Sequence, residues 1–173
     1  MIEFRPGDIF CTADPRPIGR AINACERFWE VDGRAEYSHA GILLDADGTT
    51  FEALWRVQRQ QLSVCYAHKR LLVGRHCGMT PKRFERAWAK AQRREGRRYP
   101  LWRLGLHLVP PLAKYIGCGG WMVCSELAAW FLCEAGLMDH CMGVTPGYLA
   151  DAIKRWDDFD VVYERPACEV VPS

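Results

Sequence analysis

The 173-residue sequence contains no long hydrophobic run, and no segment approaches the roughly 18 uninterrupted apolar residues that predict a membrane-spanning helix. Residues 1–6 do not combine a basic region with a following hydrophobic stretch, so they do not resemble a secretory signal. Neither a membrane-spanning nor an exported protein is therefore predicted. We expect a cytoplasmic protein.

The sequence also lacks the closely spaced cysteine pairs that usually mark zinc sites. Its nine cysteines are an odd number without repeated spacing, so reduced thiols in a cytoplasm are the simplest interpretation. The sharper alternative is a metal site built from the residues that lie closest together in sequence, namely Cys118, Cys124, Cys133, Cys141 and His140. Because no Cys-x-x-Cys pair occurs among them, we expect no metal and no other cofactor.

A strong excess of one charge sign is absent as well. The net charge of +2, from 23 Lys and Arg against 21 Asp and Glu, is too small to predict a nucleic-acid partner. Basic residues do gather between residues 82 and 103, where only Glu85 and Glu95 oppose them, and a solvated helix surface is the simplest interpretation. No internal repeat or change of composition divides the chain, so residues 1–173 are predicted to form a single domain.

Hydrophobic periodicity and turn signals predict an α+β fold. Helices are predicted over residues 15–29, 81–95 or 97, 124–135 and 146–156. The Thr-Pro pairs at 80–81 and 145–146 suit the N-caps of two of these helices. Strands are predicted over residues 9–11, 38–44, 49–55, 57–64, 71–75 and 159–163. The expected architecture is an antiparallel sheet or partial barrel packed against the helix that begins at Cys124.

Cys124 is the most informative residue of the chain. It follows a glycine-rich loop, 117–120, and opens an apolar stretch that stops at Gly136, which is typical of a buried helix with a glycine stop. A cysteine in the first helical turn lies beside unpaired N–H groups and the positive end of the helix dipole. Such a position lowers the thiol pKa, and the thiolate is the nucleophilic form. The cysteines interpreted as small buried or incidental residues are Cys11, Cys25, Cys65, Cys77 and Cys168.

A predicted hairpin upstream brings a histidine and a glutamate onto one face of the sheet. With residues 45–48 as a four-residue loop, Gly41 faces Glu52, and His39 lies two residues farther along the same face. Because Gly41 has no side chain, the space over that face is expected to be open. Glu52 is then a diagonal neighbour of His39, on the order of 7 Å away between Cα atoms, and can orient the imidazole. An odd-length loop without a bulge would turn Glu52 to the other face. A packed or solvated histidine is the alternative, but Cys124 and Glu52 together favour a catalytic one.

These residues also carry a resemblance to a known family. The runs that carry it are, in order, Pro6-Gly7-Asp8-Ile9, Ser38-His39-Ala40-Gly41-Ile42, Phe51-Glu52-Ala53 and Cys124-Ser125-Glu126-Leu127. Over residues 3 to 165 the chain resembles the permuted papain-like amidases of the YaeF/YiiX group, which are relatives of the NlpC-type cell-wall peptidases. In ordinary papain-like enzymes the cysteine precedes the histidine, whereas here the strand that carries the histidine comes first.

The resemblance implies a circularly permuted papain-like (NlpC-type) fold and a cysteine peptidase or amidase activity. It carries the nucleophile onto Cys124, the base onto His39 and the orienting acid onto Glu52. The reaction implied is hydrolysis of an amide or ester through an acyl-enzyme, or acyl transfer. The backbone N–H of Cys124 is the natural first oxyanion donor. Tyr37 and Asp8 are candidates for the second donor, although Asp8 after Pro-Gly is better interpreted as a turn residue.

The resemblance leaves the substrate open. Because the lecithin:retinol acyltransferase-like proteins share the permuted layout, a lipid acyltransferase or thioesterase is one alternative, and a non-catalytic binding module is another. The apolar, proline-interrupted residues 99–115 are interpreted as a short helix and loop of the core, with an acyl-chain pocket or a lid in weak contact with a membrane surface as the alternative. Candidate pocket residues are Tyr37, Gly41, Trp102 and Leu106. The expected partner is a small acyl-amide, peptide or lipid substrate.

Overall fold

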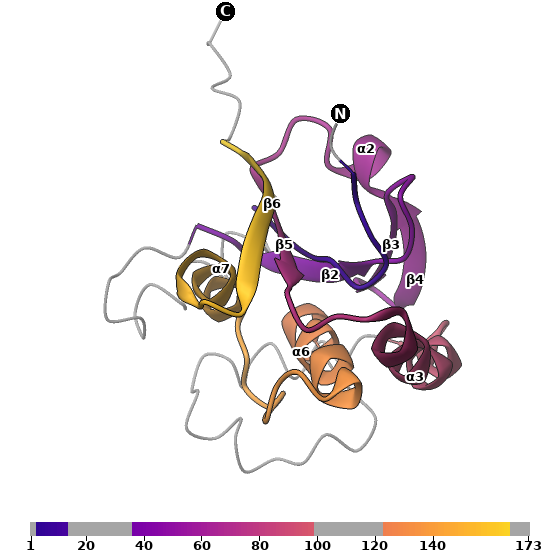
Figure 1. Ribbon diagram of the computed structural model, residues 1–173. Helices are drawn as coiled ribbons and strands as arrows, with labels where there is room; N and C mark the ends of the chain where they lie inside the picture. Colours follow the sequence, from indigo (N-terminus) through magenta and orange to yellow (C-terminus); the bar gives the residue numbers. More distant parts are fainter. Residues whose placement is uncertain (1–2, 14–35, 99–122, 167–173) are drawn as a thin grey trace, which may run out of the picture.

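The computed structural model describes residues 3–13, 36–98 and 123–166, and their strands form one six-stranded sheet (Figure 1). The strand order is β4-β3-β2-β1-β5-β6, and every neighbouring pair is antiparallel. The strands are β1 (Ile9–Thr12), β2 (His39–Leu43), β3 (Thr49–Ala53), β4 (Val57–Gln61), β5 (Leu71–His76) and β6 (Phe159–Arg165). The predicted α+β class and antiparallel sheet are confirmed.

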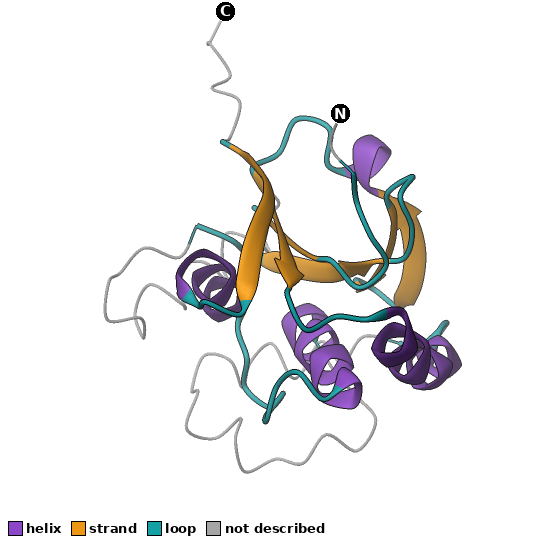
Figure 2. Ribbon diagram, viewed as in Figure 1, coloured by secondary structure: helices purple, strands orange, loops and turns teal. Residues whose placement is uncertain are grey.

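Helices from the described part of the chain cover one face of this sheet (Figure 2). They are α3 (Pro81–Ala91), α6 (Cys124–Ala135) and α7 (Pro146–Arg155), and a 3-10 turn, η1 (Gln92–Arg94), extends α3. Both predicted Thr-Pro N-caps form, because the Thr80 hydroxyl accepts the Arg83 N–H at 3.3 Å and the Thr145 hydroxyl accepts the Tyr148 N–H at 3.1 Å. Within the described residues, no helix has the length and apolar character needed to cross a membrane.

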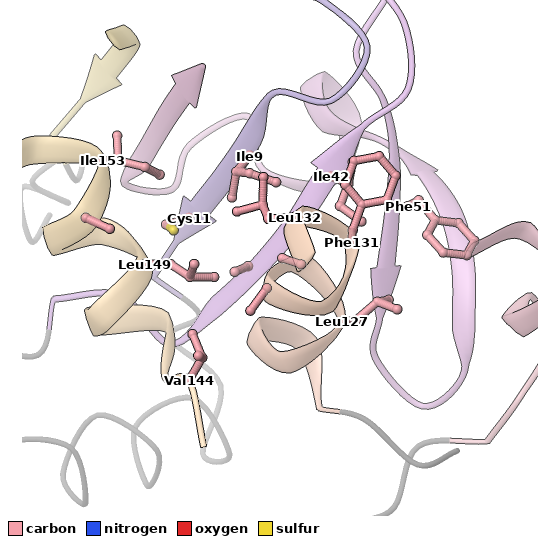
Figure 3. Close-up of a cluster of buried hydrophobic side chains, with 14 of the residues drawn as sticks. Ile9, Cys11, Ile42, Phe51, Leu127, Phe131, Leu132, Val144, Leu149 and Ile153 are labelled. Carbon is pink, nitrogen blue, oxygen red and sulfur yellow. The ribbon is translucent and has the colours of Figure 1, made fainter. Parts of the chain in front are cut away.

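The main core lies between the sheet and the helices (Figure 3). Alternate residues of the central strands, such as Ile9 on β1 and Ile42 on β2, point toward Leu127 and Phe131 of α6. Fully burying an apolar side chain of this size stabilises the fold by about 1.5–3 kcal/mol, so this layer holds α6 against β2 and β3. The position of α6, and therefore of Cys124, depends on this packing.

A second, smaller cluster of buried side chains lies on the opposite face of the same strands. Its members alternate with those of the main core along β1, β2 and β5. They are Phe10, Leu43, Leu62, Tyr66, Leu71 and Val73. Both faces of the central strands are therefore buried.

The strand predicted over residues 57–64 is partly wrong. β4 ends at Gln61, and the chain turns into a short helix, α2 (Leu62–Cys65). The Leu62 N–H bonds the Gly48 carbonyl at 2.9 Å, and its side chain packs into the smaller cluster, so burial overrides the extended pattern. The helix predicted over residues 15–29 and the segment 99–115 lie outside the described residues.

Candidate functional site

Cys124 is the first residue of α6, as its sequence context predicts. The Glu126 carboxylate accepts the Val123 N–H at 3.3 Å, which satisfies a donor that the helix itself cannot. At the other end Gly136 adopts φ 69°, a left-handed conformation that suits glycine and ends the helix. The sequence therefore fixes both ends of the helix that carries the thiol.

The first turn of α6 is also bound to the loop that precedes α7. The buried Ser125 hydroxyl donates to the Val144 carbonyl at 2.7 Å, and the Gly143 N–H donates to the Glu126 carboxylate at 3.2 Å. Buried polar groups with satisfied hydrogen bonds resist displacement, because breaking one strands a desolvated group. These contacts hold the backbone on both sides of Cys124 in one position.

The β2–β3 hairpin aligns His39 with Glu52. The observed pairs, Ile42 with Phe51 and Leu43 with Thr50, confirm the register predicted from a four-residue loop. In that register His39 and Glu52 share one face, and His39 Nε2 lies 2.5 Å from Glu52 Oε2. Both side chains are buried, so water screens this interaction little.

The thiol of Cys124 meets the histidine where β2 separates from β3. The paired residues of β2 in this ladder are Ile42 and Leu43. Two residues before Ile42, the backbone of Ala40 hydrogen-bonds the Cys124 sulfur. A side-chain hydrogen bond also joins Cys124 to His39. Because Nε2 is already held by Glu52, the remaining ring nitrogen, Nδ1, is the one that can address the thiol.

Electrostatics favour an ion pair between these two groups. Burial by itself raises the pKa of the Cys124 thiol, but the charge and hydrogen bond of His39 and the backbone of Ala40 and Ser125 hold it below its usual value. Burial lowers the pKa of His39, but Cys124 and Glu52 outweigh that penalty and raise it to about 10. Against its own desolvation, Glu52 keeps a lowered pKa through His39, Thr50 and Tyr66. The three groups thus stabilise one another's charged forms.

Two residues of this cluster were missed in the sequence. The Thr50 hydroxyl donates to Glu52 Oε1 at 2.6 Å, and the Tyr66 hydroxyl donates to Glu52 Oε2. Thr50 could have been found, because it lies two residues before Glu52 and so shares its face of β3. Tyr66 follows α2, which the sequence pattern did not reveal, so no strand periodicity pointed to it.

Asp8 does not serve as an oxyanion donor in this arrangement. Its buried carboxylate accepts two hydrogen bonds from Arg75, through Nε and Nη2 at 2.8 Å each, and the Arg5 N–H at 2.8 Å. An ionised carboxylate with these partners can only accept hydrogen bonds. The interpretation of Asp8 as a turn residue is the better one, with an added role as the anchor of Arg75.

The residues predicted for a substrate pocket lie apart or outside the described residues. A Cβ atom at Gly41 would lie 2.5 Å from the Phe10 ring, so the space expected to be open over Gly41 is filled by Phe10. The Tyr37 hydroxyl lies 3.5 Å from a Glu164 carboxylate oxygen on β6. Trp102 and Leu106 lie outside the described residues, and the pocket remains a prediction.

Comparison with known proteins relates this chain to one fold. No protein-family model matches the sequence, and no curated protein is found to match it. The crystal structure of metalloprotein YiiX from Escherichia coli O157:H7 (DUF1105) superposes with a TM-score of 0.66, covering 95% of this chain and 99% of that chain at 16% sequence identity. At this identity the likeness concerns the fold, so the chain has a YiiX-like α+β fold.

The metal of that protein is not carried over to this chain. Among residues 3–13, 36–98 and 123–166, no group of three or more His, Cys, Asp or Glu side chains is arranged to hold a metal ion. Cys133 and Cys141, which entered the metal alternative, hydrogen-bond each other.

Proposed function

We propose that this protein is a cysteine hydrolase of the permuted papain-like type, which cleaves an amide bond through an acyl-enzyme on Cys124. The observation that carries the proposal is the continuous chain of hydrogen bonds from Cys124 to His39 to Glu52, built on a helix N-terminus and a buried hairpin. A nucleophile, a base and a group that orients the base are the parts that nucleophilic catalysis requires. The YiiX-like fold supports the same conclusion.

In the acylation step, the Cys124 thiolate attacks the substrate carbonyl carbon, and a C–S bond forms. The His39 imidazolium, which holds the thiol proton, donates it to the leaving nitrogen as the C–N bond breaks. The products are a thioester on Cys124, a free amine and a neutral imidazole. Glu52 holds Nε2 throughout, so the ring stays oriented while its charge changes.

The second step releases the acyl group. Neutral His39 takes a proton from water, the hydroxide attacks the thioester carbonyl, and the C–S bond breaks to return the thiolate and the imidazolium. In both steps negative charge develops on the carbonyl oxygen. The Cys124 N–H has no acceptor within α6 because it lies in the first turn, so it is available as the first oxyanion donor.

An alternative that keeps the same residues is acyl transfer from a lipid, with a second substrate replacing water. The apolar residues 101–109 would favour it if they line the entrance to the site. Each buried CH₂ contributes about 0.8 kcal/mol, so four more acyl carbons would raise kcat/KM by roughly two orders of magnitude. A flat profile across acyl esters of increasing length, or cleavage confined to cell-wall peptides, would instead favour the peptidase.

The proposal is tested by trapping the acyl-enzyme. The protein is incubated with a panel of acyl esters, acyl amides and muropeptides, quenched in acid, and searched by mass spectrometry for an acyl group on the peptide that contains Cys124. We expect a thioester at Cys124 in the wild type and accumulation of it in variants impaired in deacylation. A panel that gives neither a Cys124 adduct nor turnover would favour the non-catalytic binding module.

A further inference from the structure

The Glu52 carboxylate accepts more hydrogen bonds than it needs to orient an imidazole. Its carboxylate is fully buried, and it accepts from His39 and Tyr66 at Oε2 and from Thr50 at Oε1. A buried carboxylate is costly unless it is paired and hydrogen-bonded. The two neutral donors contribute to keeping it ionised without supplying a competing positive charge.

Tyr66 contacts both the acid and the base. Its hydroxyl donates to Glu52, and its ring is stacked beside the His39 ring at a centroid distance of 6.0 Å and an interplanar angle of 25°. The Phe10 ring packs against both, at 6.0 Å from His39 and 5.5 Å from Tyr66. These rings line the buried side of the His39–Glu52 pair and help to exclude water from it.

The backbone of Tyr66 is held from two directions. Its N–H bonds the Leu62 carbonyl at 3.0 Å, and its carbonyl accepts a hydrogen bond from Arg165 on β6. Burial, and then the charge of Glu52, raise the pKa of Tyr66 above its usual value, so the phenol stays protonated wherever Glu52 is ionised. A fixed donor of constant charge is suited to orienting a carboxylate.

From this geometry we infer that Tyr66 is a positioning residue of the hydrolase site, which acts through Glu52 to keep His39 in its charged and oriented form. The inference rests on the proposed function and adds a residue to it. Tyr66 does not act on the substrate. Its removal should therefore alter the protonation of His39 rather than only the stability of the fold.

Tyr66→Phe isolates the hydroxyl because it keeps the stacked ring. Without this donor the Glu52 carboxylate stays ionised but is no longer held in place from the Tyr66 side. Its hydrogen bond to the His39 ring should therefore become less well aligned, and the pKa of His39 should fall. We expect kcat/KM to fall about tenfold, which corresponds to one hydrogen bond to a charged group. The upper limb of its pH profile should move to lower pH together with the His39 titration.

The direct measurement is an NMR titration of ¹³C/¹⁵N-histidine-labelled protein, with His39 assigned from the His39→Ala spectrum. Tyr163→Phe is the matched control, because Tyr163 packs against the same cluster and its described contacts do not include Glu52. A lower His39 pKa in Tyr66→Phe and an unchanged one in Tyr163→Phe is the expected result. An unchanged His39 titration in both variants would overturn the inference, even if Tyr66→Phe is less stable.

Glu52→Gln supplies a second test. In this variant the loss of the Tyr66 hydroxyl should cost little, because an amide does not require charge stabilisation. Adding Tyr66→Phe to Glu52→Gln should leave His39 and kcat/KM where Glu52→Gln alone leaves them. A further fall would mean that Tyr66 does not act through Glu52. A wild-type protein without turnover would refute the hydrolase, whereas the NMR titration would still decide the role of Tyr66.

Discussion

Asp8 and Glu52 are both buried carboxylates on neighbouring parts of one sheet, yet they differ in their positive partner. Asp8 is 1% exposed and is bound to the Arg75 guanidinium, while Glu52 is fully buried and bound to the His39 imidazole. A guanidinium stays charged across the accessible pH range, and an imidazole does not. Burial of an acidic side chain therefore does not by itself indicate a catalytic role. A partner whose charge can change is the better indicator of one.

The two pairs also differ in whether the positive partner can give up its proton. The Asp8 hydrogen bonds raise the pKa of Arg75 above its usual value, so the guanidinium keeps its charge. His39 is bonded on one side to Glu52 and on the other to the Cys124 thiol, so its proton can move. The Asp8 region should respond to mutation as a structural element, and the Glu52 region as a catalytic one.

The largest expected effect is that of Cys124→Ala. Removal of the atom proposed to bond to the substrate should lower kcat/KM at least about a thousandfold, with the fold retained because alanine fits the first turn of a helix. Cys77→Ala is the matched control, because Cys77 is an exposed cysteine outside the cluster. Comparable losses in both variants, measured on the best substrate of the acyl panel, would contradict the assignment of the nucleophile.

Glu52→Gln should have a smaller effect, because in the proposed mechanism the acid orients the base and does not bond to the substrate. We expect kcat/KM per folded molecule to fall about a hundredfold, with the fold retained. Glu134→Gln, which removes the carboxylate of a surface ion pair with Lys90, should leave turnover unchanged. Equal activity in Glu52→Gln and wild type would mean that another group holds the imidazole.

Asp8→Asn should reverse this pattern. Loss of one partner from the buried Asp8–Arg75 pair should lower the free energy of unfolding by about 3 kcal/mol. Turnover per folded molecule should stay within about twofold of wild type, because Asp8 does not contact the cluster. Asp151→Asn breaks an exposed pair and should change stability by less than about 1 kcal/mol. Chemical denaturation and kcat/KM together measure both quantities.

The last prediction concerns the pH dependence of turnover in the wild-type protein, which requires no substitution. Turnover should be lost at low pH as the Cys124 thiolate takes up a proton, and because the pKa of the thiol is lowered, this limb should lie below the usual thiol range. Turnover should be lost again near pH 10, where half of the His39 groups have lost the proton that the leaving nitrogen needs in the proposed mechanism. A profile that rises only through the usual thiol range would contradict a preformed ion pair.

The sequence was sufficient for the parts of the site that follow from local patterns. The four-residue turn determined the register of β2 and β3, and that register brings Glu52 to His39. The helix start at Cys124 followed from the glycine-rich loop and the apolar stretch after it.

The parts that were missed depend on tertiary packing. Tyr66 reaches Glu52 only because β4 ends early and α2 turns the chain back over the smaller cluster. The space over Gly41 was expected to be open, but the Phe10 ring, supplied by β1, occupies it. Neither contact follows from the spacing of residues along one element, since each depends on which strands become neighbours.

The proposed mechanism requires the Cys124 thiol to ionise below the pH at which thiols usually ionise, because of its pairing with His39. The most direct test is the rate of iodoacetamide labelling at each cysteine, mapped by peptide mass spectrometry between pH 5 and 9 in wild type and His39→Ala. Peptide mapping is necessary because the hydrogen bond from Cys133 lowers the pKa of Cys141 to about 7, so Cys141 will also label, and Cys141→Ser removes that background. Cys124 should label faster than the other described cysteines below pH 7 and lose this advantage in His39→Ala; labelling of Cys124 that is slow below pH 7, or unchanged in His39→Ala, would contradict the account.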